Sequence, residues 1–137
     1  MVHVYLVNNE GRYLIQKRSL RKALFPGAWD VTGGAVLAGE DSRQGACREV
    51  EEELGLRLDA EALTFIARLK RPDTFVDLWL ARMEVELEAL TLQPEEVDAV
   101  RFVEAEALLE VIGEPLELDD TYRAAMERLI IEGAIRA

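Results

Sequence analysis

Residues 34–56 read GAVLAGEDSRQGACREVEEELGL, and this stretch decides how the rest of the sequence is interpreted. Its first part is a loop rich in small residues. In its second part apolar residues recur every four positions, which predicts a helix over 42–54 that ends at Gly55 in the left-handed conformation. The buried face of this helix is expected to consist of Ala46, Val50 and Leu54.

Three glutamates lie on a neighbouring arc of the same helix. Glu49, Glu52 and Glu53 stand at i, i+3 and i+4, so each exposed pair is destabilised by roughly 0.2–0.5 kcal/mol. They also lie in the C-terminal half of the helix, where the macrodipole disfavours negative charge. A hard divalent cation such as Mg²⁺ or Mn²⁺, which prefers oxygen ligands, offsets both effects. On spacing alone, a solvated acidic face is an equally good interpretation.

The whole of 34–56 resembles the signature sequence of the Nudix hydrolases, position for position. The matching residues are Gly34, Glu40, Arg48-Glu49-Val50, Glu52-Glu53 and Gly55-Leu56. The resemblance implies an α/β (α+β) fold, namely an α/β/α sandwich with a central mixed β-sheet.

The same resemblance assigns roles to individual residues. It implies that Mg²⁺ (or Mn²⁺) is held by the carbonyl of Gly34 and by the carboxylates of Glu49, Glu52 and Glu53. It further implies that Arg48 orients a glutamate of this cluster, and that Glu40 supports the loop and the metal shell.

The implied reaction is hydrolysis of a nucleoside diphosphate linked to another group, a small phosphate-containing substrate. Metal ions neutralise the diphosphate and lower the pKa of a bound water, and a glutamate accepts the proton of that water. Some family members use a helix glutamate for this step and others use one from a later loop. Glu96 is the preferred loop candidate here over Glu95, with a pair of exposed loop acids as the competing interpretation.

The sequence before the glycine loop resembles the Nudix branch related to isopentenyl-diphosphate isomerase, through residues 16–19, Lys22 and residues 24–29. By that resemblance Arg18 and Lys22 bind substrate phosphates. Ordinary surface charge is the competing interpretation. Gly33 and Gly34 are expected to leave the backbone open to phosphate and metal.

Two other functions remain as alternatives. The isomerase uses a cysteine acid/base directly after the short strand, together with histidine metal ligands. Here that place reads Thr32-Gly33-Gly34, Cys47 is expected on the buried face of the helix, and the sole histidine, His3, is expected to be a structural strand residue. A non-catalytic Nudix-like module that binds a nucleotide or ADP-ribose is the other alternative, although such modules usually have a degraded signature.

The flanking sequence predicts a mixture of strands and helices. Strands are expected at 2–8, 12–18, 29–32, 63–70, 74–87 and 99–103, and further helices at 104–112 and 119–132. No repeat, low-complexity tract or linker divides the chain, so residues 1–137 are expected to form a single Nudix hydrolase domain.

Composition excludes several classes of function. The 137 residues include 16 Lys and Arg against 27 Asp and Glu, a net charge of −11. This balance disfavours binding to nucleic-acid polymers and to anionic membranes. Cys47 is the only cysteine, so no intrachain disulfide forms. No stretch is apolar over the roughly 18 residues of a membrane span, and no signal peptide precedes the first strand, so a cytoplasmic location is expected. A homodimer remains possible.

Overall fold

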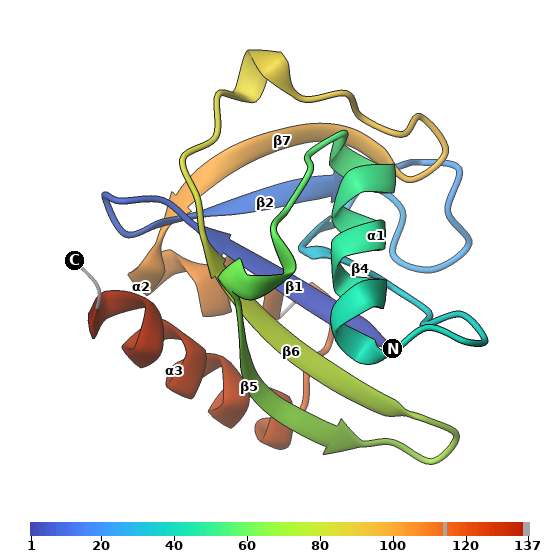
Figure 1. Cartoon of the computed structure of the whole chain (residues 1–137), viewed down its shortest axis with the longest axis vertical. Coiled ribbons are helices and arrows are strands. Elements are labelled where there is room, and N and C mark those ends of the chain that lie inside the picture. Colours follow the sequence, from blue (N-terminus) through green and yellow to red (C-terminus); the bar gives the residue numbers. More distant parts are fainter. Residues whose placement is uncertain (114, 136–137) are drawn as a thin grey trace.

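The computed structural model describes residues 1–113 and 115–135, and its strands form one seven-stranded sheet with helices on both faces (Figure 1). The strands are β1 (Val2–Val7), β2 (Arg12–Arg18), β3 (Trp29–Asp30), β4 (Thr32–Gly34), β5 (Leu63–Lys70), β6 (Phe75–Arg82) and β7 (Val97–Glu104). The helices are α1 (Ser42–Leu54), α2 (Ala105–Leu108) and α3 (Asp120–Ile135), with a π-helical turn at Leu109–Gly113 and 3-10 turns at Ala60–Ala62 and Leu87–Ala89.

The sheet is mixed, as the resemblance implied. The strand order is β3-β2-β1-β6-β5, with β4 also paired to β1 and β7 also paired to β2. Only β1 and β6 run parallel; the other described pairs are antiparallel. β1 and β2 pair through Leu6 and Val7 and then separate, and β4 takes the place beside residues 2–4 of β1. The sheet therefore splits at this point.

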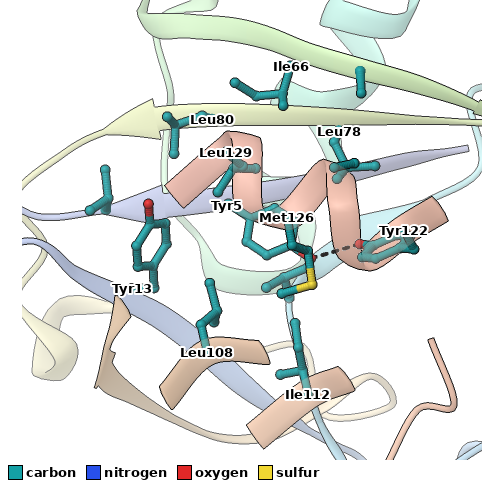
Figure 2. Packing of buried hydrophobic residues seen from close by; sticks show 14 of the residues in the cluster. Tyr5, Tyr13, Ile66, Leu78, Leu80, Leu108, Ile112, Tyr122, Met126 and Leu129 are labelled. Atoms are coloured by element: carbon teal, nitrogen blue, oxygen red, sulfur yellow. Dashed lines mark hydrogen bonds between the residues drawn. The ribbon is translucent and has the colours of Figure 1, made fainter. Parts of the chain in front are cut away.

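Alternation along β1 divides the core between the two faces of the sheet. Val2, Val4 and Leu6 pack in one cluster with the apolar face of α1, whereas Tyr5 and Val7 pack in the other. Figure 2 shows the second cluster, in which Tyr5 and the β6 residues lie against α3. The helix residues of the two clusters are Ala46, Val50 and Leu54 on α1, and Tyr122, Ala125, Met126 and Leu129 on α3. The predicted α/β/α sandwich is confirmed.

Helix α1 begins and ends at the predicted residues. Asp41 caps it: its side chain accepts a hydrogen bond from the Gln44 backbone N–H, and the Gln44 side chain accepts one from the Asp41 N–H. This reciprocal capping box satisfies two backbone donors that a helix start leaves without partners. At the other end Gly55 has φ 66°, the left-handed conformation that glycine adopts at little cost.

The strand predicted over 74–87 is shorter than expected. β6 ends at Arg82, which pairs with Val7 at the end of β1, and Ala81 pairs with Leu63 at the start of β5. Because both neighbouring strands stop here, the residues that follow have no ladder to join, although their sequence still alternates.

The other differences lie at the ends of elements. The predicted strand over 29–32 is two strands, because the chain passes from pairing with β2 to pairing with β1. β7 begins at Val97 rather than Ala99, and the helix predicted over 104–112 is α2 followed by the π-helical turn. α3 is the longest described helix, with 16 residues. No helix in the described part of the chain is long and apolar enough to cross a membrane.

Candidate active site

A cleft of about 290 Å³ opens where β1 and β2 separate. Residues from β1, β2, the loop after β2, β3, β4, α1 and the segment before β7 line it. Of the residues that the sequence assigned to substrate, metal or catalysis, the cleft brings together Arg18, Lys22, Gly33, Gly34, Glu49, Glu53 and Glu96. Arg48, Glu52 and Glu95 do not line it.

The paired glycines allow two backbones and a helix to approach closely. A Cβ on Gly34 would lie 2.5 Å from the carboxyl carbon of Glu49, and a Cβ on Gly33 would lie 2.5 Å from the carbonyl oxygen of Val2. Real Cβ atoms do not make such contacts, so a side chain at either position forces its neighbours to move. The Glu49 carboxylate thus rests directly against the backbone of β4.

Glu53 is the most buried acid of the cleft, with 4% of its surface exposed. Its Oε1 accepts a hydrogen bond of 2.8 Å from Gln16 Nε2, and Gln16 Oε1 in turn accepts one of 2.7 Å from the Thr32 hydroxyl. Burial raises the pKa of Glu53 to about 8; the Gln16 hydrogen bond opposes this rise, and the neighbouring Glu49 and Glu96 add to it. The cleft therefore holds a buried carboxyl group whose neighbours favour its uncharged form.

Arg48 ties the helix to the glycine loop. Its guanidinium donates to Glu40 at 2.8 Å, to the carbonyl of Ala35 at 2.8 Å, and to both Glu49 and Glu52 at 2.9 Å. The Glu40 carboxylate also accepts from the Leu37 N–H, and these bonds, the Arg48 one first, lower the pKa of Glu40. Arg48 thus cross-links α1 to both ends of the loop.

The three helix glutamates have different surroundings. Glu53 is buried, the side chain of Glu49 is 13% exposed, and that of Glu52 is 46% exposed. Within residues 1–113 and 115–135, no three Asp, Glu, His or Cys side chains are arranged as a ready metal site. The donor chemistry nevertheless fits a hard cation. Glu49 lies close enough to Glu53 to raise its pKa, and the backbone of Gly34 lies beside the Glu49 carboxylate, so oxygen ligands gather at one place.

Arg18 and Lys22, the two residues predicted to bind phosphate, form ion pairs with acidic side chains at the rim of the cleft. Arg18 forms an ion pair of 3.0 Å with Asp30, and Lys22 pairs with Glu96. Glu95 is exposed, so of the two loop acids only Glu96 faces the cleft.

For two residues, the sequence did not indicate that they line the cleft. Gln16 was not singled out; the signal that could have found it is a polar residue in the same alternation phase as the buried Leu14. His3 was expected to be a structural strand histidine, and it lies in β1 with its Nδ1 2.7 Å from the Tyr122 hydroxyl; the sequence did not indicate that it also lines the cleft. Cys47 is only partly buried, and it does not line the cleft.

Comparison with known proteins identifies the family. The family model described as NUDIX domain matches residues 1–129, so the chain belongs to the Nudix family. Over 109 residues it is 45% identical to a Nudix hydrolase of Listeria innocua, covering 79% of this chain and 64% of that protein. Over 111 residues it is 32% identical to a Nudix hydrolase of Deinococcus radiodurans, covering 80% and 65%. The chain thus spans less than two thirds of the length of either relative.

Solved structures agree with the fold. DR0079 from Deinococcus radiodurans superposes with a TM-score of 0.74 at 28% identity, covering 93% of this chain and 80% of that one. The NUDIX domain of Shewanella oneidensis NrtR, solved with ADP ribose, superposes with a TM-score of 0.65 at 18% identity, covering 90% and 84%. At that identity the likeness to NrtR is one of fold alone.

Proposed function

We propose that the protein is a Mg²⁺- or Mn²⁺-dependent pyrophosphohydrolase that cleaves the diphosphate bond of a nucleoside diphosphate linked to another group. The observation that carries the proposal is the burial of Glu53 beside Glu49 at a glycine-lined cleft. Two adjacent carboxyl groups with little solvent are unfavourable as a pair of anions unless a cation joins them. The same cleft carries two cationic side chains at its rim, which suits an anionic substrate.

The residues proposed to hold the metal are the carboxylates of Glu49, Glu52 and Glu53 and the carbonyl of Gly34. When bound, a divalent cation neutralises diphosphate charge and makes a bound water more acidic. Glu52 belongs to this set by the family resemblance. In the structure it shares Arg48 with Glu49, so the charge of Arg48 balances these carboxylates and Arg48 holds them on one side of the helix.

The remaining residues orient the substrate and handle the proton. Arg18 binds phosphate oxygens through the guanidinium N–H groups that its bonds to Leu24 and Asp30 do not use, and Lys22 binds them in exchange for Glu96, its present partner. The proton acceptor for an attacking water is proposed to be Glu96, or Glu53 once a bound cation favours its ionised form. Release of Lys22 to the substrate frees Glu96 for this role.

A product screen by anion-exchange chromatography, which separates nucleoside monophosphates, sugar phosphates, pyrophosphate and phosphate, tests the proposal. The protein is incubated with Mg²⁺ and a panel of nucleoside di- and triphosphates, ADP-ribose and nucleotide sugars, with Glu53→Gln and a chelator in parallel. We expect metal-dependent turnover of at least one anhydride and a loss of at least about 100-fold in Glu53→Gln, because a charged ligand or base is removed. The exposed Glu95→Gln variant serves as the matched control and should keep full activity.

A non-catalytic binding module is the second candidate. The engagement of Glu49 and Glu52 by Arg48 supports it, since Arg48 already balances part of the negative charge that would otherwise attract a cation. No turnover of any anhydride, combined with a nucleotide that raises the melting temperature, would select this function over the hydrolase.

A further inference from the structure

A second cavity, of about 240 Å³, adjoins the cleft and has a different character. Its walls are chiefly apolar: Leu24, Phe25, Ile112, Leu116, Leu118 and the ring of Tyr122. Met1, His3, Arg18 and Asp30 line both spaces. A molecule whose phosphates occupy the cleft can therefore extend a substituent into this cavity without leaving the protein surface.

The polar side chains of the cavity are already bonded to protein atoms. Arg18 donates to Asp30 and to the carbonyl of Leu24, and Asp30 also accepts from the backbone N–H of Val31. The Tyr122 hydroxyl lies within hydrogen-bond distance of both His3 and Tyr5. A substituent with many hydrogen-bonding groups gives up its hydrogen bonds to water on entering and finds few free partners in the cavity. A hydrocarbon group has no hydrogen bonds to water to give up.

The mouth of the cavity exposes apolar surface. Leu24 is 68% exposed and Phe25 is 37% exposed. Contiguous exposed apolar side chains beside a polar cleft are typical of a surface that a ligand covers.

Backbone strain is concentrated around the same cavity. The non-glycine residues with positive φ in the described chain are Phe25, at 49°, and Glu117, at 56°. Phe25 lines the cavity, and Glu117 lies between two lining residues, Leu116 and Leu118. Such conformations cost of order 1–3 kcal/mol each and cluster at ligand-binding sites.

From these observations we infer that the apolar cavity binds a hydrocarbon substituent carried by the diphosphate substrate. The inference rests on the proposed function, because that function puts a diphosphate in the adjoining cleft. It narrows the substrate to diphosphates in which one substituent is largely apolar.

Binding to wild-type protein with Mg²⁺, measured by calorimetry, tests the inference. The probes are methylenediphosphonate, which cannot be hydrolysed at its P–C–P bridge, its 3-methylbutyl ester and its cytidine ester. We expect the 3-methylbutyl ester to bind roughly tenfold more tightly than the unsubstituted compound, as burial of several methylene-sized groups predicts.

Two exposed leucines of the same loop give a matched pair of variants. Leu24 lines the cavity, whereas Leu20, 73% exposed, lines neither space. Leu24→Asn should remove most of the affinity gained from the 3-methylbutyl group and leave binding of the unsubstituted diphosphonate unchanged. Leu20→Asn should retain the gain.

Several results overturn the inference: equal affinity for the alkyl ester and the unsubstituted compound, equal effects of the two variants, or a larger Leu24-dependent gain for the cytidine ester. Its failure is distinct from failure of the proposed function. Hydrolysis of nucleotides without an alkyl gain rejects only the inference, and a Leu24-dependent alkyl gain without hydrolysis of any anhydride rejects only the hydrolase.

Discussion

At the scale of single residues, the burial of Glu53 opposes the ionisation of its carboxyl group. In the unfolded chain this carboxyl ionises near its usual value of 4.5, but in the metal-free fold its pKa rises to about 8. Between these pH values the folded protein binds a proton that the unfolded chain has released. The contribution of this group to the free energy of unfolding is therefore full below pH 4.5 and is lost as the pH rises through about 8.

This linkage predicts how Glu53→Gln changes stability in the absence of metal. The two proteins should be equally stable near pH 4.5, and at pH 8.5 the variant should be more stable by up to about 4 kcal/mol, because glutamine keeps the bond from Gln16 without a charge. Urea unfolding with a chelator present, at several pH values, measures the difference. His3, whose pKa burial lowers, titrates in both proteins and cancels in the comparison.

Added Mg²⁺ should reverse the order at pH 8, since a cation stabilises the charged Glu53 of the wild type and not the glutamine of the variant. A difference between the two metal-free proteins that does not vary with pH would mean that burial does not keep the Glu53 carboxyl protonated.

Gly34 provides the second prediction at this scale. Gly34→Ala puts a methyl group where the Glu49 carboxylate lies, 2.5 Å from its carboxyl carbon. We expect Glu49 to be displaced, with a loss of activity of about tenfold or more because site geometry is altered, and little change in stability because the glutamate can turn outward. Ala38→Ser, at an exposed position in the loop that follows β4, is the control. An unchanged affinity for Mg²⁺ in Gly34→Ala would show that Glu49 is not a ligand.

At the scale of elements, the position of α1 depends on Arg48 as well as on its apolar face. Arg48 donates to both ends of the 35–40 loop and to two glutamates of the helix. Lysine carries the same charge but cannot donate in so many directions at once. Arg48→Lys should therefore loosen the loop, with faster amide hydrogen exchange over 35–41 and a stability loss of about 1–2 kcal/mol.

Arg57 is the matched control for Arg48. Arg57 follows α1 and pairs with Glu51 of that helix, but the side chain of Arg57 is 91% exposed. Exposed ion pairs contribute little, so Arg57→Lys should change neither exchange nor stability measurably. Equal exchange rates over 35–41 in the two variants would mean that Arg48 does not hold the loop.

Elements whose signals are local were predicted well from the sequence. α1 was predicted to the residue, because its apolar spacing and its terminal glycine lie within 42–55. The end of β6 was not, because it is set by where Val7 and Leu63 end the neighbouring strands, which no local pattern records. The division of residues 29–34 into β3 and β4 is likewise set by pairing with distant strands, β2 for the first and β1 for the second.

At the scale of the whole molecule, the cleft residues also divide into those that a local stretch of sequence reveals and those that depend on how distant strands pair. Glu49, Glu53 and the paired glycines were identified because one continuous stretch carries them. The sequence did not indicate that Gln16 and His3 also line the cleft, because they reach it only through the separation of β1 from β2. Likewise, the spacing that grouped Glu52 with its neighbours does not tell that Glu52 is half-exposed and lies outside the cleft.

The cleft is also connected to α3 through hydroxyl groups. The Tyr122 hydroxyl of α3 lies 2.8 Å from that of Tyr5 and 2.7 Å from His3 Nδ1, and Figure 2 shows the pair of tyrosines between β1 and α3. Tyr13 is equally buried, but its hydroxyl has no hydrogen-bond partner in the described part of the chain. Two buried tyrosines of one core thus differ in whether their hydroxyl is satisfied.

Replacing each tyrosine by phenylalanine tests whether this connection stabilises the fold. Tyr122→Phe leaves both His3 and Tyr5 without their shared partner and should lower the free energy of unfolding by about 1–3 kcal/mol. Tyr13→Phe removes an unsatisfied hydroxyl and should be neutral or stabilising by up to about 1 kcal/mol. Urea unfolding of both variants at one pH measures the pair. Because both variants keep their aromatic rings, equal changes in stability would mean that the hydroxyl network does not join α3 to β1. A loss confined to Tyr122→Phe would instead show that the shared hydroxyl of Tyr122 helps to hold α3 against β1.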